Sequence, residues 1–352
     1  MNFKTKSDGV YNAKSVNFRN WIFTRNTLGK SLLNLIRNLL LLFLVCDNTF
    51  AAESKNNILV VRHPGEDFDQ VVKGINDELS DGFNITEFVI SQQTELKDLT
   101  NYININVPDL LVLMDNKPIN LYKKYLDTEK PENPLPSVSL MGVLIKNAIK
   151  DLKNASGITY EIPVVTSIVN LRSILGIEME YIGVIHRKYM TEFVNDNTRF
   201  CKKEGINIIN SILPNKSNNY SKILLKNLNY LIQDKNIEVL WVPNDNILLH
   251  PDLLNDVWIR TVKKFEIPVV VGVEVLVDPK LNFGTFAVLP DHTSMGVQAS
   301  EMILRIKNNG WNASSIPVEP PVAVYKIINY KQVKNMFNVK ESQLYQVDKI
   351  YK

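Results

Sequence analysis

Cysteine is scarce in this sequence. Two cysteines, Cys46 and Cys201, occur among 352 residues, and Cys46 lies in an N-terminal segment that we expect to be removed. The one remaining thiol cannot form an intramolecular disulfide, so we expect no such bridge to hold the fold. Cys201 lies in the helix-like stretch NDNTRFCKKEG and is interpreted as a packing residue. The hydrophobic content of 45% is ordinary for a globular protein and is sufficient for a full core.

Sequence patterns typical of enzymes are also missing. There is no G-x-S-x-G elbow, no Walker loop and no G-x-G-x-x-G turn. The four histidines have no metal-ligand spacing, so we expect neither a metal site nor a cofactor. These absences argue against catalysis. An α/β enzyme of glycosyltransferase-like architecture stays open as an alternative, but it would need a metal or nucleotide site that the sequence does not display.

Basic charge is concentrated at the N-terminus. Residues 1–38 hold seven Lys and Arg residues against one acid, Asp8, which leaves 33 basic and 36 acidic residues in the remainder. The net charge of +3 therefore reflects the N-terminus. Because the rest of the chain has no basic excess, we expect no nucleic-acid partner.

The N-terminal segment has the layout of a secretory signal peptide. Basic residues extend to Arg37, the apolar run LLLLFLVC follows over 39–46, and Thr49-Phe50-Ala51 comes next, with the small residues Thr49 and Ala51 where a signal peptidase needs them. Eight apolar residues are too few to span a bilayer, which takes about 20. We therefore predict a signal peptide over residues 1–51 and a protein that is exported to the periplasm. An uncleaved membrane tether and a lipoprotein modified at Cys46 are alternatives.

Short apolar runs alternate with amphipathic helices along the rest of the chain. Strands are predicted at 57–61, 108–113, 137–141, 181–185, 205–209, 239–242 and 268–273. Strands separated by helices of ten or more residues predict parallel sheets covered on both faces. ILVVRH at 58–63 and IGVIHR at 182–187 both open a strand–loop–helix unit with a histidine at the strand end. This repetition predicts an α/β protein with two Rossmann-like lobes, each with its own sheet.

Several segments together carry a family resemblance. They are HPGEDFDQVVKGINDEL (63–79), ASGITYEIPVV (155–165), VLWVPNDN (239–246), and IPVVVGVE (267–274) with its sequel GVQASEMILRIKNNG (296–310). In order and spacing they resemble the ABC transporter substrate-binding protein family, whose relatives include tryptophan and tyrosine binders. The resemblance extends over nearly all of residues 57–340. The strand followed by PNDN and the IPV strand ending in an acidic turn are its most specific parts.

The resemblance implies a type I periplasmic-binding fold, in which three crossing segments join two lobes and a ligand occupies the cleft. We place the crossings near 156–163, 273–280 and 316–324. The first lobe would then comprise residues 57–155 and 276–315. The second lobe would comprise residues 156–275 and 316–352.

Candidate ligand-binding residues lie at the strand ends, because ligands of open α/β sheets lie outside the carboxyl ends of the strands. Tyr160 and Glu161 are added because they lie at the first crossing, where they either contact the ligand or form part of the hinge. The candidates are His63, Asp67, Asp115, Asn116, Met141, Gly142, Tyr160, Glu161, His186, Asn244, Asp245, Asn246 and Glu274. Amide and carboxylate groups can bond a ligand ammonium or hydroxyl. The same side chains also favour turns and helix caps without any ligand, so a purely structural role stays open for each.

Two of these positions depart from the family pattern. Relatives tend to carry a small hydroxyl residue where this chain has the charged run Asp115-Asn116-Lys117. Met141-Gly142 replaces a pattern richer in Thr and Asp. These departures argue against an aromatic amino acid as the ligand.

The sequence thus predicts a monomeric solute-binding protein of an ABC importer. We expect it to bind a small solute, an amino acid or a related metabolite, by hinge closure. The closed complex would dock onto the membrane permease of the transporter. The alternative is a sensory or scaffold protein on the same fold, without transport, tethered to the membrane by an uncleaved N-terminus.

Overall fold

The computed structural model describes residues 55–352, which form one compact unit. The predicted signal peptide lies outside the described residues. Among residues 55–352, no helix combines the length and the apolar character needed to cross a lipid bilayer.

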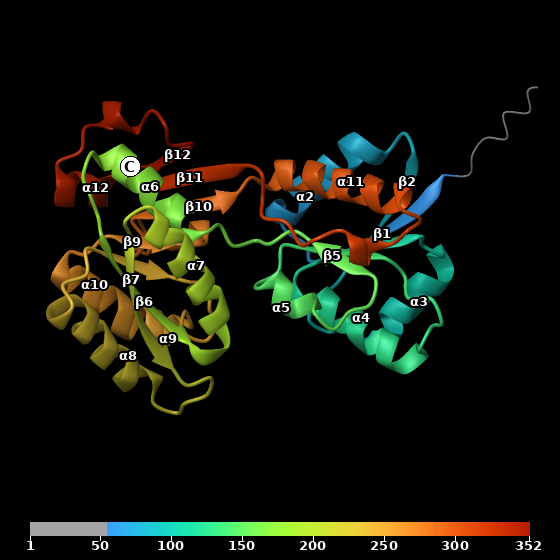
Figure 1. Ribbon diagram of the computed structural model, residues 1–352, viewed down its shortest axis with the longest axis horizontal. Helices are drawn as coiled ribbons and strands as arrows, with labels where there is room; N and C mark the ends of the chain where they lie inside the picture. Colours follow the sequence, from blue (N-terminus) through green and yellow to red (C-terminus); the bar gives the residue numbers. More distant parts are fainter. Residues whose placement is uncertain (1–54) are drawn as a thin grey trace, which may run out of the picture. The chain divides into compact units, whose positions relative to one another are not determined.

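The first lobe is built on a five-stranded sheet with the order β2-β1-β3-β4-β5 (Figure 1). All its strand pairs are parallel. The strands are β1 (Asn56–Arg62), β2 (Phe83–Val89), β3 (Leu110–Met114), β4 (Ser137–Leu140) and β5 (Ala155–Gly157). The helices are α2 (Glu66–Leu79), α3 (Leu96–Asn106), α4 (Asn116–Glu129), α5 (Ile145–Ile149) and α11 (His292–Asn308).

Two layers of helices cover this sheet. Apolar side chains of α2 and α11 pack with alternate residues of the strands in one core cluster. Apolar side chains of α3, α4 and α5 pack with the other residues of the strands in a second cluster. Because both faces are covered, strands such as β3 are buried along their whole length, as their continuous apolar sequence predicts.

The second lobe contains a seven-stranded sheet with the order β12-β11-β10-β9-β8-β6-β7. The pair β10–β11 is antiparallel and the other pairs are parallel. The strands are β6 (Tyr181–Arg187), β7 (Asn207–Leu213), β8 (Val239–Val242), β9 (Val269–Val271), β10 (Phe286–Pro290), β11 (Val324–Asn329) and β12 (Lys349–Tyr351). The α-helices are α6 (Val164–Leu175), α7 (Thr191–Lys203), α8 (Tyr220–Asn229), α9 (Pro251–Leu253), α10 (Arg260–Phe265) and α12 (Tyr330–Phe337).

Helices again cover both faces of this second sheet. Residues of α6, α7 and α12 pack on one face, and residues of α8, α9 and α10 pack on the other. Two π-helical segments, Tyr230–Asp234 and Leu254–Ile259, extend α8 and join α9 to α10. The predicted fold class, two α/β lobes with mainly parallel sheets, is confirmed.

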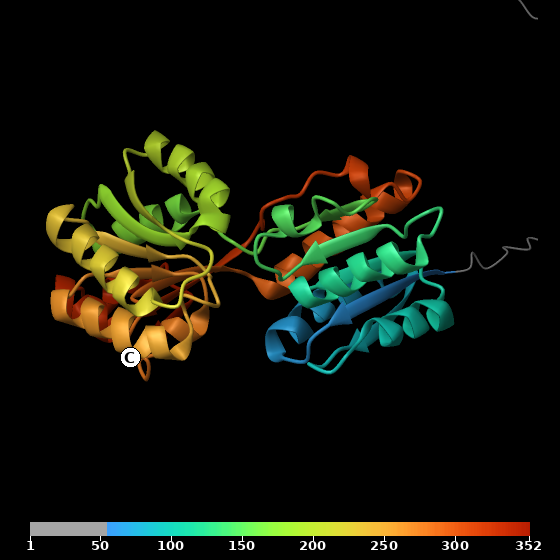
Figure 2. The ribbon, with the colours of Figure 1, turned by 90° about the horizontal axis from the view of Figure 1, so that it is seen from below.

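Three segments pass between the lobes, as Figures 1 and 2 show. The first follows β5 and the third precedes β11. They run side by side, because Ile158 and Glu319 form a parallel bridge. The amide of Thr159 donates to the carbonyl of Glu319 at 2.9 Å, and the amide of Glu319 donates to the carbonyl of Gly157 at 3.0 Å.

The predicted position of the second crossing, 273–280, is wrong. After β9 the chain makes a short 3-10 turn, Glu274–Leu276, and then returns to the same sheet as β10. Phe286 of β10 pairs with Val270 of β9, so residues 276–290 belong to the second lobe and not to the first. The chain passes to the first lobe only between Pro290 and His292, where α11 begins.

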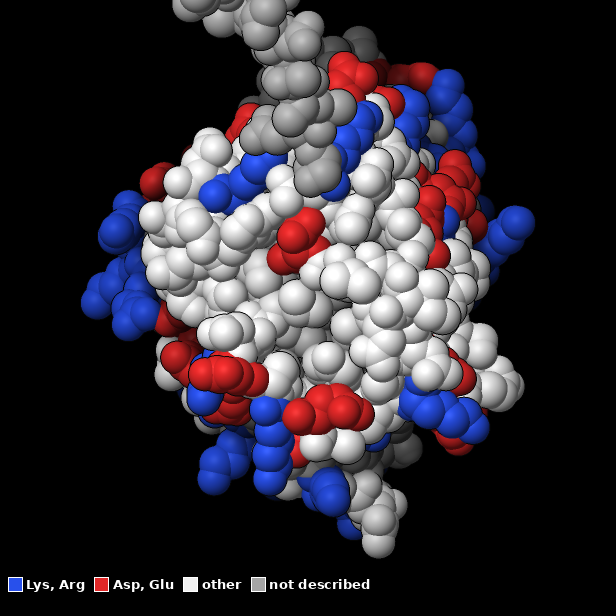
Figure 3. Space-filling model, turned by 90° about the vertical axis from the view of Figure 1, so that its right-hand side faces the viewer, with Lys and Arg blue, Asp and Glu red and all other residues white. Residues whose placement is uncertain are grey.

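Charged side chains do not form an extended patch of one sign on the face drawn in Figure 3. Lys and Arg side chains alternate there with Asp and Glu around a largely uncharged centre. This face therefore offers no basic surface of the kind that binds a polyanion.

Candidate functional site

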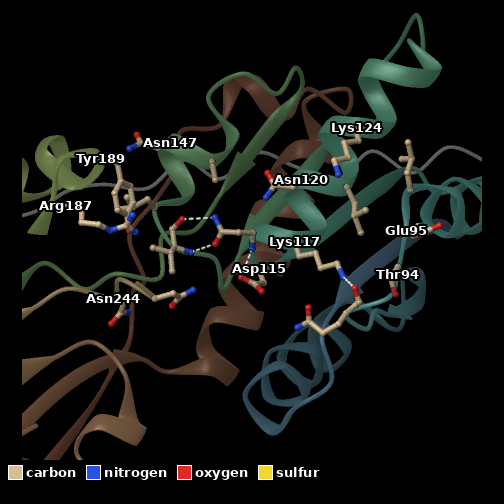
Figure 4. A pocket seen from close by; sticks show the side chains of 18 residues that line it. Thr94, Glu95, Asp115, Lys117, Asn120, Lys124, Asn147, Arg187, Tyr189 and Asn244 are labelled. Carbon is tan, nitrogen blue, oxygen red and sulfur yellow. Dashed lines mark hydrogen bonds between the residues drawn. The ribbon is translucent and has the colours of Figure 1, made fainter. Parts of the chain in front are cut away.

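A cavity of about 920 Å³ lies where strand ends of the two sheets meet residues of α4 and α5. We call it the α4 cavity (Figure 4). The first lobe lines it with residues of the loop after β2, of α4 and of the α5 region. The second lobe contributes Arg187, Tyr189, Asn244 and Asn246. It therefore lies at the carboxyl ends of parallel strands, where open α/β sheets bind ligands.

Asp115 and His63, two of the predicted site residues, meet beside this cavity. Asp115 follows β3 with a φ of 90°, which is uncommon for a residue with a side chain. Its carboxylate accepts a hydrogen bond from the amide of Asn116 at 2.6 Å and caps α4. Another carboxylate oxygen lies 3.3 Å from Nε2 of His63, which follows β1. The structure thus brings together two groups that are 52 positions apart in the sequence.

Asn116 holds the loop after β4 against the start of α4. Its side-chain nitrogen donates to the carbonyl of Val143 at 3.0 Å, and its side-chain oxygen accepts from the amide of Val143 at 2.7 Å. Met141 packs against the core of the first lobe. A Cβ on Gly142 would come within 3.0 Å of Oδ1 of Asn116, so glycine leaves room for this clasp. Of these three residues only Asn116 lines the cavity, and its side-chain amide is used within the protein.

Asp245 is the buried centre of the turn after β8. It is 2% exposed and accepts hydrogen bonds from Nε and Nη2 of Arg187 at 2.7 and 2.8 Å. The same carboxylate accepts from the amides of Ile247 and Leu248. The Arg187 guanidinium also lies 4.5 Å from the ring centre of Tyr189. Asp245 therefore positions the wall that Arg187 and Tyr189 present to the cavity, without lining it.

Asn244 and Asn246, on either side of Asp245, both line the α4 cavity. Asn246 is exposed. The side-chain nitrogen of Asn244 donates to the carbonyl of Gly272 at 3.2 Å. Its oxygen is buried and has no hydrogen-bond partner among residues 55–352. This leaves a buried acceptor at the end of β8, close to the cavity.

A small void of about 30 Å³ continues from Asn244 toward the first crossing segment. Tyr160 and Glu161 line it together with the ends of β8 and β9. Oε1 of Glu161 accepts a hydrogen bond from the amide of Leu144 at 2.7 Å. Burial disfavours the charged form of this carboxyl and raises the pKa of Glu161 above its ordinary value.

A third hollow of about 790 Å³, which we call the hinge cavity, shares Tyr160 with this void. The Tyr160 hydroxyl lies 3.1 Å from Nε2 of His292, and the two rings are stacked with centroids 5.9 Å apart. Nδ1 of His292 lies 3.4 Å from Oδ1 of Asp67. Burial raises the pKa of the Tyr160 phenol, so this hydroxyl stays protonated. The first and second crossing segments are thus joined by one aromatic contact.

Glu274 lines the hinge cavity but is paired within the second lobe. Its Oε1 accepts hydrogen bonds from Nζ of Lys349 at 2.5 Å and from the Tyr351 hydroxyl at 2.6 Å. Burial acts to raise the pKa of Glu274, but these two donors outweigh it and hold the pKa below its ordinary value. A ligand amine would have to compete with Lys349 for this carboxylate.

His186 is misplaced as a candidate. It is buried in β6 and is not among the residues that line the three hollows described above. Its Nδ1 lies 3.0 Å from the carbonyl of Arg187, and its Nε2 has no partner among residues 55–352. Burial lowers the pKa of His186, which favours the neutral ring. The strand-end rule fails here because side chains alternate between the two faces of a strand, and this one points into the core.

Several cavity residues were missed by the sequence analysis. They are Lys124, Asn120, Asn147, Arg187, Tyr189 and His292. The sequence contained a signal for two of these residues, Asn120 and Lys124. Lys117, Asn120 and Lys124 are spaced as one face of a helix that begins at a strand end, and such a face borders the cleft. Arg187 is the last residue of β6 and Tyr189 lies two residues later, so both could have been included by the same rule that selected His186. No pattern indicates that His292 faces Tyr160.

The described residues contain no group of three or more His, Cys, Asp or Glu side chains that could hold a metal ion. The histidine–carboxylate pairs of the site, His63 with Asp115 and His292 with Asp67, are two-residue contacts.

Comparison with known proteins identifies the fold. No family model matches the chain, and no curated protein matches its sequence. A ligand-free, open substrate-binding protein with adhesive properties from Clostridium difficile has a TM-score of 0.60 and 16% identity, covering 84% of this chain and 99% of its own. An ABC domain from Streptococcus pneumonia in complex with L-Trp has a TM-score of 0.54 and 18% identity, covering 84% of this chain and 100% of its own.

A conserved domain protein from Vibrio cholerae is similar to the same extent, with a TM-score of 0.55 and 16% identity over 84% of this chain and 100% of its own. At sequence identities of 16–18%, the similarity to these three structures shows a shared fold and no more. Two lobes with mainly parallel sheets, joined by three crossings, constitute the type I periplasmic-binding fold, and this chain has it.

Proposed function

We propose that this protein is the extracytoplasmic solute-binding component of an ABC importer and that it binds a small solute, an amino acid or a related metabolite. The observation that carries the proposal is the α4 cavity of about 920 Å³ with lining residues from both lobes. Pockets for small molecules have volumes of roughly 300–1,000 Å³, with a few polar groups that set orientation.

A solute in this cavity would act by stabilising one conformation of the two lobes. Arg187, Tyr189 and Asn246 come from the second lobe, whereas α4 and α5 belong to the first. A ligand that contacts both sets favours the arrangement in which both are within reach. The parallel bridge between Ile158 and Glu319 keeps two crossing segments together and suits rotation about a common hinge. The closed complex would then dock onto the permease, and no bond of the solute is made or broken.

The nature of the solute is narrowed by two features. One structural relative was solved with L-Trp, which favours an amino acid or a similar molecule. The carboxylate of Asp115 stands where relatives tend to have a small hydroxyl residue, which disfavours a ligand carboxylate at that strand end. We therefore expect a solute whose acidic group, if it has one, is bound elsewhere in the cavity.

A ligand-screened melting curve tests the proposal. A solute that binds only the folded protein stabilises it by about 2.7 kcal/mol at a concentration of 100 times its Kd. We expect at least one member of a broad metabolite panel to raise the melting temperature, and the Tyr189→Ala variant to lose part of that shift. Mass spectrometry of molecules that co-purify provides an independent check. A panel that gives no shift at millimolar concentration would contradict the proposal.

A second candidate is favoured by one observation. Three of the polar groups predicted to bind ligand are occupied within the protein, namely those of Asn116, Asp245 and Glu274. This would suit a sensory or scaffold protein on the same fold, held at the membrane by an uncleaved N-terminus. N-terminal sequencing of the exported protein, together with the presence or absence of adjoining permease and ATPase genes, distinguishes the two candidates.

A further inference from the structure

The first-lobe wall of the α4 cavity is one face of helix α4. Lys117, Asn120, Leu121 and Lys124 all line the cavity. Their spacing of i, i+3, i+4 and i+7 places them on one side of the helix. Figure 4 shows the labelled side chains of Lys117, Asn120 and Lys124 along this wall.

Both carboxylates that line the cavity already have cationic or potentially cationic neighbours. Asp115 lies 3.3 Å from Nε2 of His63, and Glu95 lies 3.1 Å from Nζ of Lys97. Neither His63 nor Lys97 is a lining residue. The charge of Glu95 is therefore partly offset by Lys97, which lies outside the cavity, and the carboxylate of Asp115 is in contact with the His63 ring.

The lysine charges of the same wall have no such compensation. Nζ of Lys117 donates to the backbone carbonyls of Ser91 and Gln92 at 2.6 and 2.9 Å, which orients the ammonium but leaves its charge in place. Lys124 is exposed, and no hydrogen bond joins it to the other side chains drawn in Figure 4. Arg187, the third cation, is paired with buried Asp245. The positive charge that remains is thus on α4.

The α4 cavity and the hinge cavity also differ in the polar groups that line them. Asn120, Asn147 and Asn246 line the α4 cavity and each carries a side-chain NH₂ group. The hinge cavity is acidic instead. Five carboxylates line it, and Lys349, which pairs with Glu274, is its one lysine or arginine among the lining residues. An anion is therefore favoured at the α4 wall and disfavoured at the other hollow.

We propose that the α4 wall binds an anionic side group of the solute, a carboxylate or a phosphate in addition to any α-carboxylate, with Lys124 as its direct ion-pair partner and the nearby amides as donors. The inference rests on the proposed function and goes beyond it by naming the charge and the orientation of the ligand. The anionic end lies along α4, and the rest of the molecule extends toward Asn244 and the void below Tyr160. The anion is thus kept away from the carboxylate of Asp115 at the end of β3.

Matched pairs of probes and matched variants test this. Titration calorimetry with the intact protein compares L-glutamate with L-glutamine and O-phospho-L-serine with L-serine, alongside the metabolite panel sorted by net charge. We expect the more anionic member of a binding pair to bind about tenfold more tightly, as one charge-assisted contact provides. Lys124→Gln should remove most of that advantage. Lys123→Gln, the same change one residue earlier and outside the cavity lining, should leave it intact.

The possible outcomes of these titrations distinguish the kind of anion that binds and show whether the α4 wall binds one. A preference for phosphoserine over glutamate assigns a phosphate, and the reverse assigns a carboxylate. Raising the salt concentration should reduce the advantage in the wild type, because exposed charges are screened. If only neutral or cationic solutes bind, or if Lys124→Gln and Lys123→Gln behave alike, the anion site is overturned while solute binding stands. If no probe and no panel member binds, solute binding itself fails. Unchanged melting of unliganded Lys124→Gln verifies that the variant folds.

Discussion

Asp245 accepts hydrogen bonds from two nitrogens of the Arg187 guanidinium, Nε at 2.7 Å and Nη2 at 2.8 Å. Arg187 ends β6 and Asp245 lies in the turn after the neighbouring strand β8, so their contact fixes the turn that carries Asn244 and Asn246. With Asp245 2% exposed and the Arg187 side chain 12% exposed, solvent screens this pair little. The pair therefore supports the second-lobe wall of the cavity.

Removing the carboxylate should be costly. Asp245→Ala leaves a largely buried guanidinium without its partner and two turn amides without an acceptor. Breaking a buried ion pair from one side costs about 3–5 kcal/mol. We expect the free energy of unfolding, measured in urea, to fall by about that amount. Asp252→Ala, whose side chain is 85% exposed, is the control and should cost under about 1 kcal/mol. Equal losses in the two variants would contradict the structural role of Asp245.

This pair also shows the limit of prediction from sequence. The turn after β8 was predicted from the abrupt change from VLWV to PNDN, a local signal of strand end and turn. The partner of Asp245 lies 58 positions earlier, and no local pattern connects them. The sequence analysis therefore found the position of the turn but could not tell which of its three side chains points inward.

More of the fold than of the site could be predicted from the sequence, because strands and helices leave local patterns and site contacts do not. Buried parallel strands are continuous apolar runs, and their alternation with helices is visible in one sequence. The second crossing was predicted too early, at 273–280. Strand β9 is short, Val269–Val271, and the acidic turn after it was interpreted as the point where the chain leaves the lobe. The antiparallel pairing of β10 with β11 depends on contacts between distant segments. The contact of Tyr160 with His292 could not be predicted for the same reason, because the two residues are distant in the sequence.

The clasp between Asn116 and Val143 leads to a second prediction. Asn116→Ala removes both hydrogen bonds that hold the loop after β4, and each contributes about 1 kcal/mol. We expect a loss of about 2 kcal/mol in the free energy of unfolding and weaker solute binding, because this loop forms part of the cavity rim. Asn120→Ala, an exposed change on the same helix, should leave stability within about 0.5 kcal/mol. A stability loss confined to Asn120→Ala would refute this assignment.

Two glycines allow α2 and α11 to approach closely, and this yields a third prediction. A Cβ on Gly296 would lie 2.2 Å from the carbonyl oxygen of Val71, and one on Gly74 would lie 2.2 Å from that of Thr293. Alanine is favoured over glycine within a helix by about 1 kcal/mol, but here the overlap with backbone atoms outweighs this preference.

We therefore expect Gly296→Ala to destabilise the protein by about 1–3 kcal/mol, as overpacking does. Thermal unfolding followed by circular dichroism measures the change. Gly82→Ala is the matched control, because no atom lies within 4 Å of its added Cβ. If Gly296→Ala melts at or above the wild-type temperature, the helices can separate without loss and the close contact is not required.

Glu161 should make stability depend on pH. Its pKa is raised in the folded protein by burial, above the ordinary value of 4.5. Between the two pKa values the folded state therefore binds more protons than the unfolded state, and stability falls as the pH rises. The contribution of the protonated carboxyl is fully present below 4.5. It is lost as the pH rises from there through the raised pKa of the folded state.

Glu161→Gln isolates this effect, because the amide oxygen can still accept the hydrogen bond from Leu144 but does not titrate. We expect the difference in unfolding free energy, wild type minus variant, to decrease as the pH rises from about 4 and to level off above the folded-state pKa. Urea unfolding over a series of buffers measures it. A difference that stays constant with pH, or that grows as the pH rises, would mean that the Glu161 carboxyl is not held in a desolvated position beside the hinge.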